Sequence, residues 1–314
     1  MSNFLQNNNS CVIFSLVMQM KNKLRGILAL MVATVIWGSA FIAQSVGMDH
    51  IGPMTFQAVR CALAFIFLMP LTFLFSGDKD VTARNWRDPK LWKAGILCGS
   101  ALFVAGGLQQ IGLVYTSAGK AGFITAMYIV LVPILGVFLK KRPSLTAWLS
   151  VAVAVGGLYL LSCVGVSEIN KGDLLLLGCA VAFAVQITLV DRHAGDLDGI
   201  QLNCVQSLVC SLLSAVVMFA SEEPKMGDIL ACWLPLAYAG ILSMGIAYTL
   251  QIVGQKHLEP TPASLIMSLE SVYAAVFGWL ILKERMAPHE LLGCGLVFAA
   301  VMISQIPTKA KTHE

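Results

Sequence analysis

Long apolar runs separated by short polar stretches recur along the whole chain of 314 residues. Many of these runs approach the ~20 residues that a helix needs to cross a bilayer. Ten of them are predicted to be membrane-spanning helices, at about residues 25–46, 54–75, 92–114, 119–139, 145–163, 172–190, 200–220, 232–252, 262–282 and 290–306. Strands of a membrane barrel would instead alternate over about ten residues. The pattern therefore predicts an all-α membrane protein with ten transmembrane helices.

The composition agrees with this pattern. Hydrophobic residues make up 57% of the chain and charged residues 12%, and the mean hydropathy is +0.78. A soluble domain is typically about a quarter charged. The predicted loops are too short to hold a soluble domain, so the function is expected to lie within the membrane.

The two ends of the chain are predicted to be tails, at residues 1–24 and 307–314. Cys11–Met18 is apolar but too short to span, and no small-residue cleavage pattern marks a signal peptide. A basic flank for the first span follows Met20. Two interpretations stay open: translation starts at Met18 or Met20, or the N-terminal segment is a genuine tail.

The positive charges are distributed unevenly between the two sides of the predicted bundle. Fifteen of the 21 Lys and Arg residues fall on the side of the termini, five on the other side, and Arg60 lies within a span. Cytoplasmic loops carry the excess of positive charge in membrane proteins. The charge pattern therefore predicts a multi-pass protein of the plasma (cell inner) membrane with both termini in the cytoplasm.

Three segments of the first half match segments of the second half at a spacing of 142 to 146 residues. The matched pairs are Gly26–Phe41 with Gly172–Ile187, Leu108–Gly112 with Leu250–Gly254, and Phe138–Ser144 with Ile281–Ala287. Each half, 25–163 and 172–306, holds five predicted spans. Because five is odd, the second half enters the membrane inverted, as in many secondary transporters. The alternative is that apolar runs of similar composition always align to some degree.

These motifs give the chain a resemblance to a known family. WGSAF in the first span, Arg60 in the second, the run SLESVYAAVFGWLILKER in the ninth and the paired five-helix units resemble the EamA-type branch of the drug/metabolite transporter superfamily. The resemblance covers about residues 25 to 306 and implies membrane transport of a small metabolite, frequently export. The chain departs from the family at Ser271, where proline often follows the glutamate, and Lys141 stands where the second repeat has Glu284.

Polar and aromatic side chains within the spans are the candidate substrate-binding residues, because such groups turn away from lipid. The resemblance places a central cavity among spans 1, 3, 4, 6, 8 and 9. The candidates on these spans are Trp37, Gln109, Tyr128, Gln186, Tyr248, Gln251, Glu270 and Tyr273. Gln109 and Gln251 match across the repeat. Hydrogen bonding between helices, worth about 0.6–2 kcal/mol per contact, is the alternative role for each of them.

Among the charged residues of the spans, Arg60 and Glu284 are expected to have structural or coupling roles, and Glu270 is a candidate for substrate binding. Arg60 either anchors its span by reaching toward the nearer interface or contacts the substrate. Glu270 either bonds a neighbouring helix, with Arg60 as one partner, or binds a cationic group or an exchanging proton in the cavity. Glu284 is expected to orient the end of the ninth span. Pro133 is expected to interrupt the hydrogen-bond ladder of the fourth span.

The sequence favours a secondary transporter that works by alternating access on a small polar or amphipathic metabolite, amino acid-like or drug-like. No G-x-x-x-x-G-K-[ST] loop, H-E-x-x-H or G-x-S-x-G motif occurs, and no catalytic residue, metal site or cofactor is expected. Expected partners are the solute and the lipid bilayer, with no nucleic acid. Proton or solute-gradient coupling and a homodimer stay open. The alternatives are a polytopic membrane enzyme and a membrane sensor or scaffold that does not transport.

Overall fold

A computed structural model of the chain describes residues 2–116, 118–141, 143–162, 170–282 and 286–306. Within these ranges all regular elements are helices. The first half contains α1 (Ser2–Met48), α2 (Pro53–Leu74), α3 (Lys79–Asn85), α4 (Pro89–Leu113), α5 (Ala118–Thr125), α6 (Tyr128–Phe138) and α7 (Leu145–Ser162). The second half contains α8 (Lys171–His193), α9 (Gly199–Ser221), α10 (Met226–Ala231), α11 (Trp233–Ala237), the π-helix η1 (Tyr238–Ala247), α12 (Tyr248–Gln255), α13 (Pro260–Met267), α14 (Leu269–Leu282) and α15 (Pro288–Ser304).

Ten membrane-spanning segments account for most of these helices. Eight segments in the described part of the chain are long and apolar enough to cross a membrane, and the two shorter apolar helices α7 and α15 complete the ten predicted spans. The fourth, eighth and ninth spans are each divided, into α5 and α6, into α11, η1 and α12, and into α13 and α14. The predicted all-helical, ten-span fold is confirmed.

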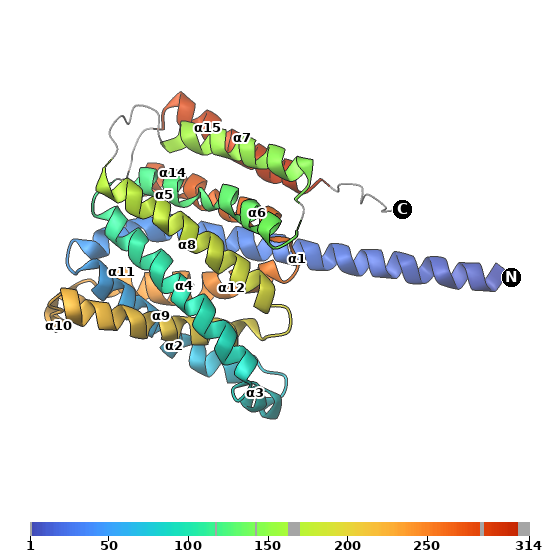
Figure 1. Cartoon of the computed structure of the whole chain (residues 1–314), viewed down its shortest axis with the longest axis horizontal. Coiled ribbons are helices and arrows are strands. Elements are labelled where there is room, and N and C mark those ends of the chain that lie inside the picture. The colour runs from blue at the N-terminus through green and yellow to red at the C-terminus, as the bar shows by residue number, and fades with distance from the viewer. Residues whose placement is uncertain (1, 117, 142, 163–169, 283–285, 307–314) are drawn as a thin grey trace.

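The packing of the helices follows an inverted repeat. Helix α1 of the first unit packs against α12 of the second, and its counterpart α8 packs against α4. The two second spans, α2 and α9, pack against each other, as do the two fifth spans, α7 and α15. Figure 1 shows α15 and α7 together at one edge of the bundle, with the start of α1 and the end of α15 on the side of α3. Helices of each unit therefore pack against helices of the other, and corresponding helices make corresponding contacts.

Glycines at matched positions permit two close crossings between the units. A Cβ atom on Gly26 would lie 3.0 Å from the Gly254 oxygen, and one on Gly254 would lie 3.0 Å from the Gly26 oxygen. The equivalent crossing of α4 and α8 joins Gly112 and Gly172, where a Cβ on Gly172 would lie 2.8 Å from the Gly112 oxygen. Small residues let membrane helices approach closely enough to bring their backbones into contact. The same contact thus occurs twice, as the inverted repeat requires.

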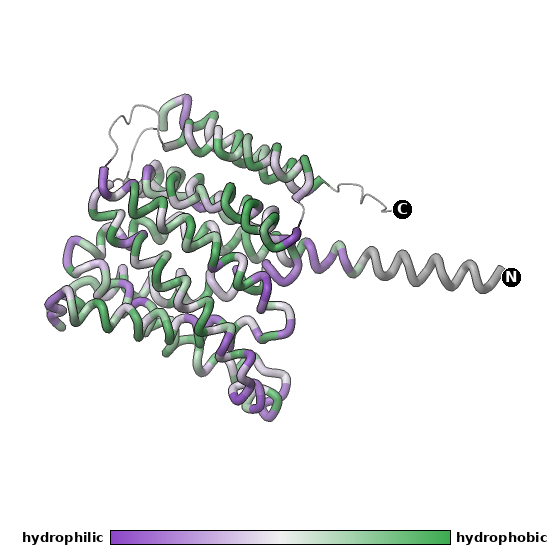
Figure 2. The backbone as a smooth tube through the Cα atoms, viewed as in Figure 1, coloured by the Kyte–Doolittle hydropathy of each residue, from purple (hydrophilic) through white to green (hydrophobic). Residues whose placement is uncertain are grey.

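The bundle surface is largely apolar between its two ends. Large apolar side chains within the helices, such as Ile66, Leu177 and Leu212, are 64%, 50% and 58% exposed. Figure 2 shows hydrophobic residues along the middle of the helices and hydrophilic ones mainly at their ends and in the loops. Lipid tails can cover such a surface, because apolar side chains are as compatible with lipid as with one another. Polar groups therefore lie mainly in the interior of the bundle and at its two ends.

Two of the divided spans break at positions that the repeat relates. The backbone bonds from Ile129 N to the Ala126 oxygen and from Ser271 N to the Ser268 oxygen both span three residues instead of four, at 3.0 and 3.2 Å. Ala126 and Ser268 are separated by the repeat spacing of 142 residues. The break in the fourth span therefore precedes Pro133, which lies inside α6. Pro133 lies within α6, where it has no N–H to donate to the ladder, and the division of the span occurs before it.

Candidate substrate site

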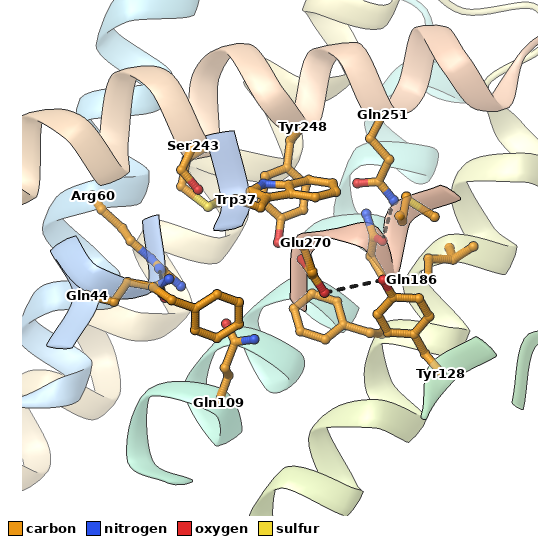
Figure 3. Close-up of a pocket in the computed structure, with 15 residues that line it drawn as sticks. Trp37, Gln44, Arg60, Gln109, Tyr128, Gln186, Ser243, Tyr248, Gln251 and Glu270 are labelled. Atoms are coloured by element: carbon orange, nitrogen blue, oxygen red, sulfur yellow. Dashed lines mark hydrogen bonds between the residues drawn. The ribbon is translucent and has the colours of Figure 1, made fainter. Parts of the chain in front are cut away.

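A small cavity lies where helices of both units meet (Figure 3). Its volume is about 40 Å³, which leaves room for only a few water molecules at roughly 10–15 Å³ each on this measure. The lining is amide-rich and aromatic, with one arginine and one carboxylate. The lining residues are Trp37, Phe41, Gln44, Arg60, Gln109, Tyr128, Phe183, Gln186, Ile187, Ser243, Met244, Tyr248, Gln251, Met267 and Glu270.

Seven of the eight candidate residues from the sequence line this cavity. They are Trp37, Gln109, Tyr128, Gln186, Tyr248, Gln251 and Glu270. The lining does not include Tyr273, whose ring meets Phe298 of α15 edge-on at 6.4 Å between centroids. One turn after Glu270, the side chain faces the neighbouring fifth span of its own unit. Glu284 lies outside the described residues.

Glu270 and Tyr128 link the fourth and ninth spans. Tyr128 Oη donates to Glu270 Oε1 at 3.3 Å, and the two residues are 4% and 8% exposed. They are separated by 142 residues, so they occupy matched positions of the two units, just after the break in each span. Glu270 also lies in the first turn of α14, where the helix dipole favours negative charge. The inverted repeat thus brings an acidic and a phenolic group together in the cavity.

Arg60 lies on a different part of the cavity wall. Its Nη1 donates to Gln44 Oε1 at 2.6 Å, its Nη2 donates to Gln57 Oε1, and its guanidinium lies 5.7 Å from the centre of the Phe56 ring. The residue is 4% exposed, so its charge stays in the protein interior and does not reach the interface. Among the described residues it forms no ion pair with a carboxylate, and the expected pairing of Arg60 with Glu270 does not occur.

Several polar atoms of the cavity wall are buried without a hydrogen-bond partner among the described residues. They are Trp37 Nε1, Arg60 Nε, Gln186 Nε2 and Gln251 Oε1. Leaving a buried donor or acceptor unpaired costs about 1–3 kcal/mol. Three donors and one acceptor of the residues that line the cavity therefore lack a partner in this structure. Figure 3 shows Trp37 beside Tyr248, whose rings meet edge-on at 5.0 Å between centroids.

The arrangement of these helices and the two five-helix units correspond to a known family. The family model of the EamA-like transporter family matches residues 24–163 and again residues 170–305. The chain belongs to the EamA-like transporter family. It is therefore a multi-pass membrane transporter, and the two matches coincide with the two units of the fold.

Relatives of known sequence agree with this membership. An uncharacterized transporter of Archaeoglobus fulgidus is 31% identical over 96% of this chain and 94% of its own length. The threonine/homoserine exporter RhtA of Escherichia coli is 26% identical, over 91% of this chain and 92% of its own. A solved crystal structure superposes with a TM-score of 0.74 at 17% identity, covering 89% of this chain and 96% of that one, and supports the fold.

The sequence did not indicate every residue of this transporter's cavity. Ser243 and Met244 reach the wall because the eighth span winds as a π-helix before Tyr248. The Asn203 side chain of α9 donates to the Met244 and Gly245 oxygens at 2.9 and 2.8 Å, which satisfies carbonyls in this wider turn. No local residue pattern marks such a turn. Gln44, by contrast, continues the face of Trp37 and could have been included on that basis.

Proposed function

We propose that this EamA-like transporter exports a small zwitterionic metabolite of the amino acid type by alternating access. The observation that carries the proposal is that Arg60 and Glu270, of opposite formal charge, line one buried cavity and are not paired with each other. Charged groups inside a membrane protein are costly and usually mark a solute or ion path. A solute with one carboxylate and one ammonium group complements both residues.

The chemistry of the wall assigns a part of the solute to each residue. The guanidinium of Arg60 presents its unpaired Nε to a carboxylate, and arginine is well suited to carboxylate recognition because its donors form a planar fork. Glu270 receives the ammonium group, with Tyr128 beside it. Trp37, Gln186 and Gln251 offer the remaining unpaired groups. The Escherichia coli relative is named for the export of threonine and homoserine, which are zwitterions of this kind.

Movement of the divided spans is part of the proposal. The cavity of about 40 Å³ is too small for an amino acid, so the surrounding helices must separate before a solute can enter. The breaks at Ala126 and Ser268 adjoin Tyr128 and Glu270, so a solute that contacts these two side chains acts directly on both breaks. Discontinuous helices at the centre of inverted repeats serve this purpose in many secondary transporters.

The charge distribution supports a location in the plasma membrane with both termini in the cytoplasm. In this topology the two five-helix units comprise residues 25–163 and 172–306. Tyr273 and Glu284 are then supporting residues of the ninth span, and Arg60 is a substrate residue. Coupling to a proton through Glu270 or to the solute gradient itself would drive export.

Flux of four related solutes into proteoliposomes tests the proposal. The set is an amino acid, its methyl ester as a cation, its N-acetyl derivative as an anion, and a polyol of similar size. The proposal predicts that the amino acid enters fastest and that each of the other three solutes only weakly inhibits the entry of the amino acid. Equal flux of the polyol, or faster flux of either singly charged derivative, would contradict the zwitterion assignment.

A further inference from the structure

Two ion pairs join the fourth span to α8 at opposite ends. Lys120 Nζ lies 2.6 Å from Asp173 Oδ2, and Lys141 Nζ lies 2.5 Å from Asp191 Oδ2. Asp173 and Asp191 are 18 residues apart on α8, which corresponds to about 27 Å along a helix. That distance is close to the ~30 Å hydrocarbon thickness of a bilayer. One pair therefore lies near each membrane edge, and neither lines the cavity.

The first pair is buried and held rigidly. The side chains of Lys120 and Asp173 are 11% and 7% exposed. Asp173 belongs to a capping box with Asn170: its Oδ2 accepts from Asn170 N at 2.9 Å, and its own N donates to Asn170 Oδ1 at 3.1 Å. The start of α8 therefore fixes the position of the carboxylate, and α5 brings the ammonium group to it.

The second pair is more exposed, and the end of α6 positions it. Lys140 has a left-handed backbone with φ of 61°, and the N–H groups of Lys140 and Lys141 return to the Val137 and Gly136 oxygens at 2.9 and 2.8 Å. These bonds form a Schellman motif, which aims Lys141 at α8. The side chains of Lys141 and Asp191 are 52% and 15% exposed, so salt reaches this pair far more easily than the first.

The break at Ala126 and Met127 lies between the two pairs. Helix α8 is continuous from Lys171 to His193, whereas α5 and α6 are separate helices joined at this break. Each of them is tied to α8 at the end remote from the break. In addition, Ser271 Oγ donates to the Gly122 oxygen at 3.2 Å, which fixes the base of α5 to α14. Release of one ion pair would therefore loosen one of the two helices, α5 or α6, at its end, while the other pair still ties its helix to α8.

We propose that the two ion pairs are the two gates of the transporter. The Lys120–Asp173 pair, the Asp173 gate, closes the cavity at one membrane edge, and the Lys141–Asp191 pair, the Asp191 gate, closes it at the other. Opening swings α5 or α6 away from α8 about the break beside Tyr128. In the structure both pairs are formed, and the cavity of about 40 Å³ is too small for an amino acid. This inference rests on the proposed alternating access.

Matched cysteine reporters distinguish the two gates. Gln109 lies near the end of α4 that crosses the start of α8 at Gly112 and Gly172. Its counterpart in the repeat, Gln251, bonds Gln186 of α8 at 3.1 Å, toward the Asp191 gate. Each is replaced by cysteine in a chain carrying Cys11→Ser, Cys163→Ser and Cys294→Ser. The other six native cysteines are buried.

The rate of labelling with a polar maleimide reports whether each gate is open, and no solute is needed. The protein is held in lipid nanodiscs, in which the reagent reaches both faces of the membrane. Lys120→Gln with Asp173→Asn should accelerate labelling of Gln109→Cys by up to about fivefold, the factor that corresponds to an ion pair worth about 1 kcal/mol, and leave Gln251→Cys unchanged. Lys141→Gln with Asp191→Asn should do the reverse. If a gate variant changes the labelling rates of both reporters equally, or changes neither, the ion pairs are not two separate gates.

Ionic strength supplies a test without substitutions in the gates. The screening length falls from about 30 Å at 0.01 M salt to about 3 Å at 1 M, so salt should accelerate labelling of Gln251→Cys, behind the exposed gate, more than that of Gln109→Cys. A free thiol labelled in the same buffers corrects for the reagent. The opposite order would contradict the assignment. If labelling follows the prediction but no solute in the set is transported, the gates stand and the zwitterion proposal fails.

Discussion

Replacement of Glu270 by Gln separates a role in solute binding from a role in packing. Gln keeps the shape of the side chain and an oxygen that can accept from Tyr128 Oη, now at 3.3 Å, but it carries no charge. Hydrogen bonds between membrane helices are worth about 0.6 kcal/mol on average and at most about 1.7. We therefore expect Glu270→Gln to change the free energy of unfolding by less than about 1 kcal/mol.

The loss of charge should have a much larger effect on transport. Removing one member of a buried charge pair costs about 2–5 kcal/mol of binding energy. At about 1.4 kcal/mol per tenfold change, this corresponds to a solute affinity lower by roughly 30-fold to several thousand-fold. Glu270→Gln should therefore fold normally and show lost transport, or residual transport that no longer depends on pH.

Two further variants complete this experiment. Glu270→Ala also removes the acceptor from the buried Tyr128 hydroxyl, which costs about 1–3 kcal/mol, so it should lower both thermal stability and transport. Glu259→Gln is the control, because Glu259 is exposed and precedes α13 outside the cavity. Thermal unfolding in detergent and flux in proteoliposomes are measured on all three. Normal, pH-dependent transport by Glu270→Gln together with unfolding of Glu270→Ala at lower temperature would refute the binding role.

Three other predictions address topology, cavity and packing. Reporter fusions after Lys93, Arg142 and Ile306 should all give a cytoplasmic signal, and an outside signal at any of them would overturn the orientation. Cysteines that replace the cavity residues one at a time should mostly react with a small aqueous thiol reagent; the positions are Trp37, Gln109, Tyr128, Gln186, Tyr248 and Gln251. If most of these cysteines do not react, the residues do not line a water-accessible cavity. Gly254→Ala should lower stability by about 1–3 kcal/mol, because its Cβ would lie 2.6 Å from a leucine carbon. Gly295→Ala should not, because a Cβ there would meet no heavy atom of the described residues within 4 Å. Equal melting temperatures of the two variants would contradict the close crossing.

Much of the architecture could be predicted from the sequence because bilayer thickness imposes the length of each span. The match of Gln109 with Gln251 across the repeat and the presence of polar and aromatic residues within the spans also led to residues that the structure brings to one cavity. These features depend on spacing along single helices. Spacing survives folding, so a one-dimensional pattern is enough to detect it.

The details that position the site depend on contacts between helices and could not be predicted in the same way. The break at Ala126 contains neither glycine nor proline, while Pro133 lies inside a continuous helix. The π-helix before Tyr248 receives hydrogen bonds from Asn203, which lies 41 residues before Met244 in the chain. Arg60 meets Gln44 and Gln57 in the interior although its position along the span suited an interfacial anchor.

Counterflow in proteoliposomes tests the central claim most directly. Vesicles containing the purified protein are loaded with an unlabelled amino acid and diluted into a trace of the labelled one, without any ion gradient. A carrier that opens its gates alternately must exchange the two, so labelled solute should accumulate transiently above its outside concentration, and Glu270→Gln should abolish this rise. Entry that only approaches the outside concentration, or no entry for any amino acid tested, would contradict the account.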